Sequence, residues 1–125
     1  MDSRCNEISG AIVDAAYHVH CALGPGLLES VYEKVLAHEL SDRGFEVRAQ
    51  VPVPIKYGSI QLEEGFRADL IVSNMVIVEL KSVEKIQPVH SKQLLTYLRL
   101  LGFRLGLLIN FNVPLIKDGI VRIAN

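Results

Sequence analysis

The chain has 125 residues, of which 50% are hydrophobic and 22% are charged, and its net charge is −1. This composition excludes a disordered chain, and the length favours a single domain over residues 1–125 that buries its own core without disulfides or metal. No apolar run reaches the roughly 18 residues of a membrane span, and the N-terminus lacks a basic region followed by an apolar stretch. We therefore expect a cytoplasmic protein with no membrane partner.

The charge is distributed unevenly along the chain. Residues 1–65 contain five Lys and Arg against ten Asp and Glu, whereas residues 66–125 contain eight against four. The basic half suits an anionic partner, but the near-neutral total argues against strong nonspecific nucleic-acid binding. An ordinary solvated surface explains the asymmetry equally well.

Two helices are expected in the first third of the chain. Over residues 6–23 apolar side chains recur at spacings of three and four, and a Gly-Pro-Gly segment follows. The same periodicity predicts a second helix over about residues 27–43, with Gly44 at the position after its end. Cys5 and Cys21 lie 16 residues apart, about 24 Å along such a helix, so we expect two free thiols.

Strands follow the helices. Alternating apolar residues from Val47 to Tyr57 predict a strand, although Pro52 and Pro54 restrict it to a sheet edge or make it irregular. Phe66–Val72 and Val76–Ser82 are strand-like runs joined by a tight turn. They predict a β-hairpin with one wholly apolar face.

The remaining elements complete a mixed fold. A third helix is expected over about residues 91–101, and a buried strand over residues 105–110. An Asp-Gly turn precedes a possible edge strand over residues 120–123. The order α-α-β-β-β-α-β-(β) predicts an α/β (α+β) fold with a mixed central β-sheet flanked by helices.

The hairpin carries the most informative group of polar residues. If its turn is centred on Asn74, paired residue numbers sum to 148, so Asp69 faces Glu79 and Arg67 faces Lys81. All four then share one face with Ile71 and Ile77, because side chains alternate along a strand. Two carboxylates therefore lie roughly 5 Å apart on strands that otherwise read as buried.

This arrangement has two interpretations. Opposed like charges destabilise a hairpin, whereas a divalent cation between them reverses the sign of the interaction. Oxygen ligands favour Mg²⁺ or Mn²⁺, and Lys81 would then orient the attacking water or neutralise charge on a phosphate. Alternatively, Asp69, Glu79 and Lys81 form an ion cluster on a solvated face.

Polar residues on two of the expected helices suit the same metal-dependent chemistry. Gln93 and Tyr97 are four residues apart on the third helix, with His90 three residues before Gln93. A helix with a polar edge accounts for this stripe as well. On the second helix, Glu29 and Tyr32 share a face, and Glu29 also suits the positive end of the helix dipole.

Taken in order, these residues resemble the PD-(D/E)xK nuclease superfamily. The resemblance rests on Arg67-Ala68-Asp69, on Val78-Glu79-Leu80-Lys81, and on Gln93-x-x-x-Tyr97, and it extends from about Ile8 to Ile123. Within the superfamily, the segment from Gly26 to Tyr32 is similar to the signature of the GxxExxY family.

The resemblance implies a restriction-endonuclease-like core and a site on it. Asp69, Glu79 and the backbone carbonyl of Leu80 would ligate Mg²⁺ or Mn²⁺, and Glu29 would reach the metal directly or through water. Lys81 would serve the nucleophilic water. Two further sets are implied around this centre: Gln93 and Tyr97 in catalysis, and Tyr32, Arg67, His90 and Lys92 in substrate binding. The residue before Asp69 is Ala68 where the superfamily motif has proline, a position that supplies no ligand.

The leading functional hypothesis is a metal-dependent phosphodiesterase that hydrolyses nucleic acid, DNA more than RNA. A homodimer would pair two sites or two basic faces. One alternative is a non-catalytic nucleic-acid-binding or partner module that retains the fold. Another is a hydrolase of a smaller nucleotide substrate, for which an enclosed pocket would be the distinguishing feature.

Overall fold

The computed structural model describes residues 3–125. Its elements follow one another in the predicted order, and the possible last strand is present. The helices are α1, α2 and α3 and the strands β1 to β5, with a short 3₁₀ helix, η1, before the last strand. Their bounds are α1 Ser3–Leu23, α2 Glu29–Asp42, β1 Val47–Tyr57, β2 Ile60–Val72, β3 Val76–Lys81, α3 Pro88–Leu101, β4 Leu105–Asn110, η1 Ile116–Gly119 and β5 Ile120–Ala124.

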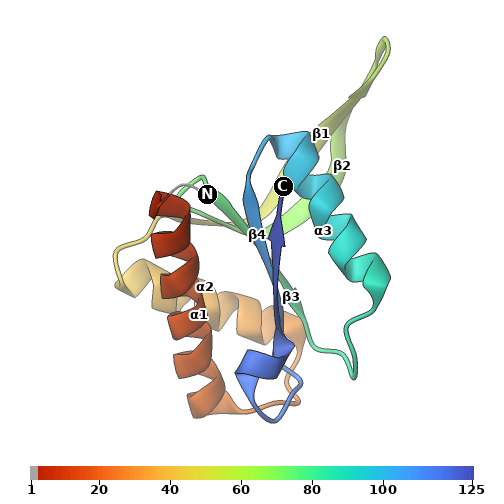
Figure 1. The fold of residues 1–125 in the computed structure, drawn as a ribbon. Helices are drawn as coiled ribbons and strands as arrows, with labels where there is room; N and C mark the ends of the chain where they lie inside the picture. Colours follow the sequence, from red (N-terminus) through yellow and green to blue (C-terminus); the bar gives the residue numbers. More distant parts are fainter. Residues whose placement is uncertain (1–2) are drawn as a thin grey trace.

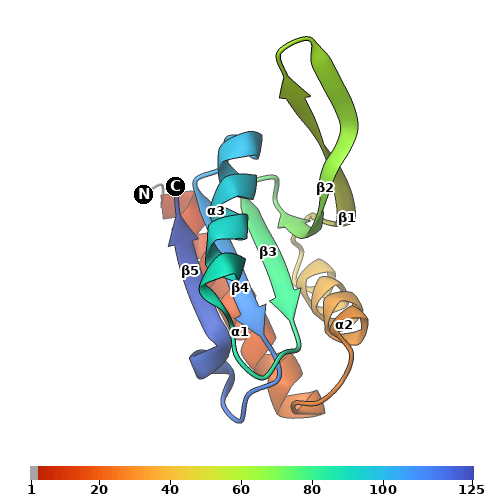
Figure 2. The same ribbon diagram turned by 90° about the vertical axis from the view of Figure 1, so that its right-hand side faces the viewer.

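The strands form a five-stranded mixed sheet in the order β1-β2-β3-β4-β5. β3 and β4 are parallel, and the other neighbouring pairs are antiparallel. A parallel pair needs a crossover connection, and α3 provides it. Helices α1 and α2 cover one face of the sheet and α3 covers the other (Figures 1 and 2). The expected mixed α+β fold is confirmed.

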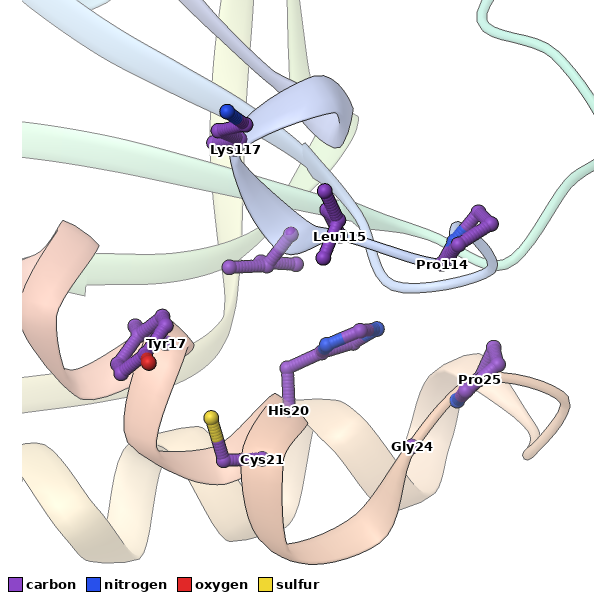
Figure 3. Close-up of a pocket in the computed structure, with 9 residues that line it drawn as sticks. Tyr17, His20, Cys21, Gly24, Pro25, Pro114, Leu115 and Lys117 are labelled. Carbon is purple, nitrogen blue, oxygen red and sulfur yellow. The ribbon is translucent and has the colours of Figure 1, made fainter.

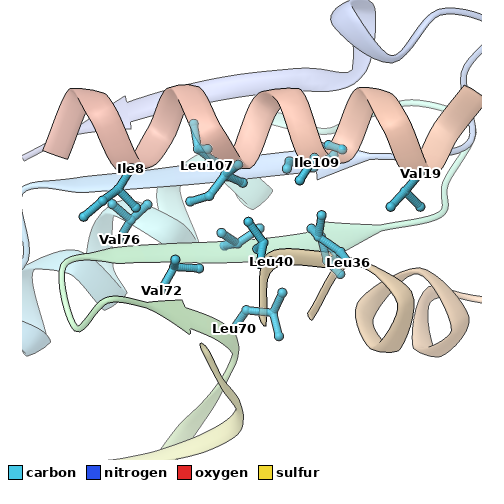
Figure 4. Packing of buried hydrophobic residues seen from close by; sticks show 14 of the residues in the cluster. Ile8, Val19, Leu36, Leu40, Leu70, Val72, Val76, Leu107 and Ile109 are labelled. Carbon is cyan, nitrogen blue, oxygen red and sulfur yellow. The ribbon is translucent and has the colours of Figure 1, made fainter. Parts of the chain in front are cut away.

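The core consists of two apolar clusters, one on each face of the sheet. The cluster under α1 and α2 includes Ile8, Leu36 and Leu40 from the helices and meets β2, β3 and β4 (Figure 4). The cluster under α3 contains Leu94 and Leu98. Every residue of β4 is buried, as expected for a central strand covered on both faces.

The β1–β2 hairpin extends well beyond the rest of the sheet (Figures 1 and 2). β1 is an edge strand, and its register shifts between Val53 and Ile55, next to the prolines, as the sequence indicated. β2 begins at Ile60, six residues before the predicted start at Phe66. These extra residues are exposed and contain Gly65, over which the Ile55 side chain packs so closely that a Cβ atom would clash.

The helices end close to where the sequence predicted, but their starts differ: α1 begins three residues early, at Ser3, and α2 begins two residues late, at Glu29. Gly44 and Gly102 adopt the left-handed conformation that ends a helix, with φ of 93° and 71°. α3 begins at Pro88, three residues before the predicted start, because Gln87 and His90 form a capping box there. Cys5 and Cys21 are both free thiols. Among the described residues no helix has the length and apolar character that a membrane crossing requires.

Candidate functional site

The site is built where β2 and β3 separate. Backbone pairing joins Val72 to Val76, Ile71 to Ile77, and Leu70 to Val78, which is the predicted register. The faces are also as predicted: Ile71 and Ile77 pack with the α3 cluster, and Leu70 packs with the opposite one. The backbone hydrogen bonding between β2 and β3 ends at Leu70 and Val78. Beyond this point the two strands are joined by hydrogen bonds from backbone N–H groups to side chains.

Asp69 and Glu79 bridge the two strands at this point. The backbone N–H of Asp69 donates to Glu79 Oε2 at 2.8 Å, and the backbone N–H of Leu80 donates to Asp69 Oδ2 at 2.9 Å. One oxygen of each carboxylate therefore accepts a hydrogen bond from a backbone N–H of the other strand. The predicted proximity of the two carboxylates is confirmed, and each keeps a second oxygen for another partner.

Burial makes this pair electrostatically unusual. Glu79 is only 8% exposed. Removal from water, followed by the charge of Asp69, raises the pKa of Glu79 to about 8 from 4.5. Burial also raises the pKa of Asp69, while the Leu80 N–H and the Lys81 charge oppose that rise. Two carboxylates with raised pKa values on adjacent strands are typical of a functional site.

Lys81 provides the positive charge of the site. Its charge lowers the pKa of both carboxyls, yet among residues 3–125 it forms no ion pair with either of them. This geometry does not support the alternative of a closed Lys–Glu–Asp ion cluster. Lys81 pairs with Asn110 of β4, whose buried side-chain amide binds the backbone N–H and C=O of Val83. Asn110 thus fixes the chain that leaves β3.

Helix α2 brings a second pair of carboxylates to the site. Glu29 begins the helix, and its Oε2 lies 3.4 Å from the backbone nitrogen of Ser82. The Ser82 hydroxyl donates to the Leu27 carbonyl at 2.7 Å, which ties the end of β3 to the start of α2. A polar pocket of about 370 Å³ lies here, lined by Glu29, Ser30, Glu33, Gln50, Asp69 and Leu80.

Three of these lining residues, Ser30, Glu33 and Gln50, were not among the predicted site residues. Glu33 lies one helical turn after Glu29, so its i, i+4 spacing was a usable signal. Burial raises the pKa of Glu33, and a hydrogen bond from Gln50 opposes the rise. Nothing in the sequence marks Gln50, which reaches the pocket from β1.

Helix α3 contributes one predicted residue clearly. Tyr97 stacks on Phe66 of β2, with ring centroids 3.8 Å apart. Its pKa is raised by burial and then by the negative charges of Glu79 and Asp69, so its ring lies within electrostatic range of the pair. Gln93 is exposed and forms no hydrogen bond with the carboxylates among the described residues.

The family model described as the PD-(D/E)XK nuclease superfamily matches residues 6–123. The chain belongs to this superfamily. The mixed sheet, the flanking helices and their order are consistent with its restriction-endonuclease-like core. No curated protein and no solved structure matches the chain.

In this PD-(D/E)XK protein, several residues that were expected to bind substrate make contacts that stabilise the fold instead. Tyr32 is 0% exposed, stacks on Phe111, and bonds through its hydroxyl to the Gly24 carbonyl and the Leu27 N–H. A side chain enclosed in this way cannot reach a substrate, so this prediction is wrong. Tyr32 instead fixes the loop that leads to Glu29.

Three further expectations concern basic residues. Arg67 does not face Lys81, because the pairing of β2 with β3 covers only Leu70–Val72. The Arg67 guanidinium instead binds Glu64 at 2.7 and 3.0 Å. His90 Nδ1 accepts a hydrogen bond from the Gln87 N–H at 3.0 Å. His90 is therefore part of the capping box at the start of α3. Lys92 is exposed on α3 and stays a prediction as a substrate contact.

The residues present fit the divalent metal that PD-(D/E)XK nucleases typically use. Within residues 3–125 no three His, Cys, Asp or Glu side chains are already grouped around one ion position, since Asp69 and Glu79 each turn an oxygen toward a backbone amide. Their donor chemistry is nevertheless suitable. Two adjacent, partly desolvated carboxylates and a strand carbonyl at Leu80 are the oxygen ligands that a hard divalent ion prefers.

A larger pocket, of about 570 Å³, lies elsewhere in the structure (Figure 3). It lies between the end of α1 and the segment around η1, and its lining is mostly apolar. His20 turns its Nε2 to the Val113 carbonyl at 2.8 Å, so this side chain already has a structural partner. None of its lining residues lines the carboxylate pocket, and its chemistry does not suit a phosphodiester.

Proposed function

We propose that this protein is a metal-dependent phosphodiesterase that hydrolyses nucleic acid, with DNA as the preferred substrate. The observation that carries the proposal is the reciprocal bridge between Asp69 and Glu79, beside Lys81, in a chain that belongs to a nuclease superfamily. The proposal includes membership of the GxxExxY family, to whose signature the segment from Gly26 to Tyr32 is similar.

Local charge supports the requirement for a cation. Glu29, Glu33, Asp69 and Glu79 influence one another electrostatically, and Lys81 is the cation that acts on the central pair. A phosphodiester would be repelled by such an excess of negative charge. A bound divalent ion offsets this repulsion, which makes the metal necessary for substrate binding as well as for chemistry.

The roles of the residues follow from their positions. Asp69, Glu79 and the Leu80 carbonyl would hold Mg²⁺ or Mn²⁺, with Glu29 at the rim. The ion, when bound, supplies a Lewis acid that polarises the phosphate and acidifies water. Lys81 orients the attacking water and stabilises negative charge that develops on the phosphate oxygens. Tyr97 closes the site from the α3 side.

The reaction would be an in-line displacement at phosphorus. Water forms a bond to phosphorus as the bond to the 3′ oxygen breaks, and the departing oxygen takes up a proton. The products are a 5′-phosphate and a 3′-hydroxyl. Gln93 and Lys92, both exposed on α3, are proposed contacts for the substrate backbone.

A cleavage assay tests the proposal. Labelled single- and double-stranded DNA, RNA and free nucleotides are incubated with the protein in Mg²⁺ or Mn²⁺ and in excess chelator. We expect metal-dependent cleavage of DNA that Asp69→Asn and Lys81→Ala abolish. Lys85→Ala, which removes an exposed lysine from the loop after β3, is the matched control and should retain activity.

The same assay separates the alternatives. Hydrolysis of nucleotides without cleavage of polymers would assign the smaller substrate. Metal binding without hydrolysis of any substrate would assign a binding module. A homodimer is part of the proposal and is tested by sedimentation with and without DNA.

A further inference from the structure

Gln50 has an unusual backbone conformation for a strand residue. Its φ is 52°, in the left-handed region. Within residues 3–125, the other non-glycine residues with positive φ are Ser73 and Asn74, which form the β2–β3 turn, where this conformation is ordinary. Gln50 lies instead within β1, and its side chain gains no local hydrogen bond of the kind that stabilises Asn or Asp in this conformation.

The conformation places Gln50 beside the proposed metal ligands. Ala49 pairs with Leu70 and Val51 pairs with Ala68, so Gln50 is the β1 residue opposite Asp69. Its Nε2 donates to Glu33 Oε1 and lies 3.5 Å from Asp69 Oδ1. The amide therefore spans the gap between the strand that carries Asp69 and the helix that carries Glu33.

An amide suits this position chemically. It offers two N–H donors, enough for one oxygen on each carboxylate. Because it carries no charge, it can hold two carboxylates in place without competing with a cation, as an arginine or lysine would. The other oxygen of Asp69 already accepts the Leu80 N–H, so Gln50 is the remaining contact that sets the orientation of this carboxylate.

We propose that Gln50 is a positioning residue, held in a strained backbone conformation so that its amide bridges Asp69 and Glu33 and orients Asp69 for the cation. Backbone strain of this kind persists where the surrounding structure requires it, and it concentrates at functional sites. The inference rests on the proposed function, because it assigns Gln50 to the metal centre of that site.

Two substitutions separate positioning from structural support. Gln50→Gly removes the amide and suits the left-handed backbone, and Gln50→Asn also tolerates that backbone but is one methylene too short to bridge the carboxylates. We expect both variants to melt at or above the wild-type temperature. Both should lose 10- to 100-fold in Mn²⁺ affinity, measured by calorimetry, and a similar factor in DNA cleavage, the usual effect of removing a group that orients a metal ligand.

Ser73→Gly is the matched control, since it relieves a similar φ of 51° away from the pocket. It should raise thermal stability without changing Mn²⁺ affinity. Wild-type affinity and cleavage in both Gln50 variants would overturn the role of Gln50 while leaving the nuclease proposal intact. Failure of the wild type itself to bind Mn²⁺ and cleave DNA would overturn the proposed function, and the role of Gln50 with it.

Discussion

The raised pKa of Glu79 has a measurable consequence for folding without metal. Between pH 4.5, the ordinary pKa of the carboxyl, and pH of about 8, its pKa in the folded protein, the folded state binds a proton that the unfolded chain does not. Stability must therefore fall as pH rises through this window. At about 1.36 kcal/mol per pKa unit, the loss is at most about 5 kcal/mol. Asp69, whose pKa is also raised, adds to it in the same direction.

Glu79→Gln removes this dependence while conserving size. The glutamine carbonyl can still accept the Asp69 N–H, so the strand bridge is retained. Below pH 4.5 the variant should match the wild type, because glutamine resembles a protonated glutamate. In chelator at pH 8 to 9 it should be more stable by a few kcal/mol, measured by urea unfolding across the pH range.

Glu63→Gln is the control, since it makes the same chemical change at an exposed position of the β1–β2 hairpin. It should leave the pH dependence unchanged. Identical pH–stability curves for Glu79→Gln and the wild type would refute the reasoning, because Glu79 would then ionise in the folded protein as it does in the unfolded chain.

Three further predictions follow from the same site. Mg²⁺ at 100 times its Kd should stabilise the wild type by about 2.7 kcal/mol, raising its melting temperature by several degrees, and should not stabilise Asp69→Asn; equal shifts would place the ion elsewhere. Lys81→Ala should lower cleavage roughly 100-fold or more with little change in melting temperature, whereas marked destabilisation would favour a purely structural lysine. Tyr32→Phe should cost about 1–2 kcal/mol in urea unfolding and leave the activity of the folded protein unchanged, since its hydroxyl binds the loop before α2.

The fold could be predicted because its elements have clear periodicities. The apolar spacing of α1, the short turn after Val72 and the apolar run of β4 before Asn110 each restrict the local structure to one solution. The short turn also fixed the hairpin register, and with it the proximity of Asp69 and Glu79. The extension of β2 to Ile60 was missed, because that segment is exposed and contains two acidic residues and a glycine.

The rest of the site depends on long-range geometry. Arg67 could not be placed from the hairpin register, because β2 pairs with β3 only over Leu70–Val72, whereas the earlier part of β2 pairs with β1 alone. Tyr32 shares a helical face with Glu29 in projection, yet tertiary packing on Phe111 buries it. Gln50 was beyond prediction, since a left-handed glutamine within a strand has no local sequence signal.

The central claim is that Asp69 and Glu79 form a divalent metal site, and a Mn²⁺ titration followed by calorimetry tests it most directly. The wild type at pH 8, close to the pKa of Glu79 without metal, should bind Mn²⁺ at a site that Asp69→Asn abolishes and Lys81→Ala preserves, because a charged lysine donates no lone pair to a metal. No binding by the wild type, or binding that Asp69→Asn leaves unchanged, would contradict the claim.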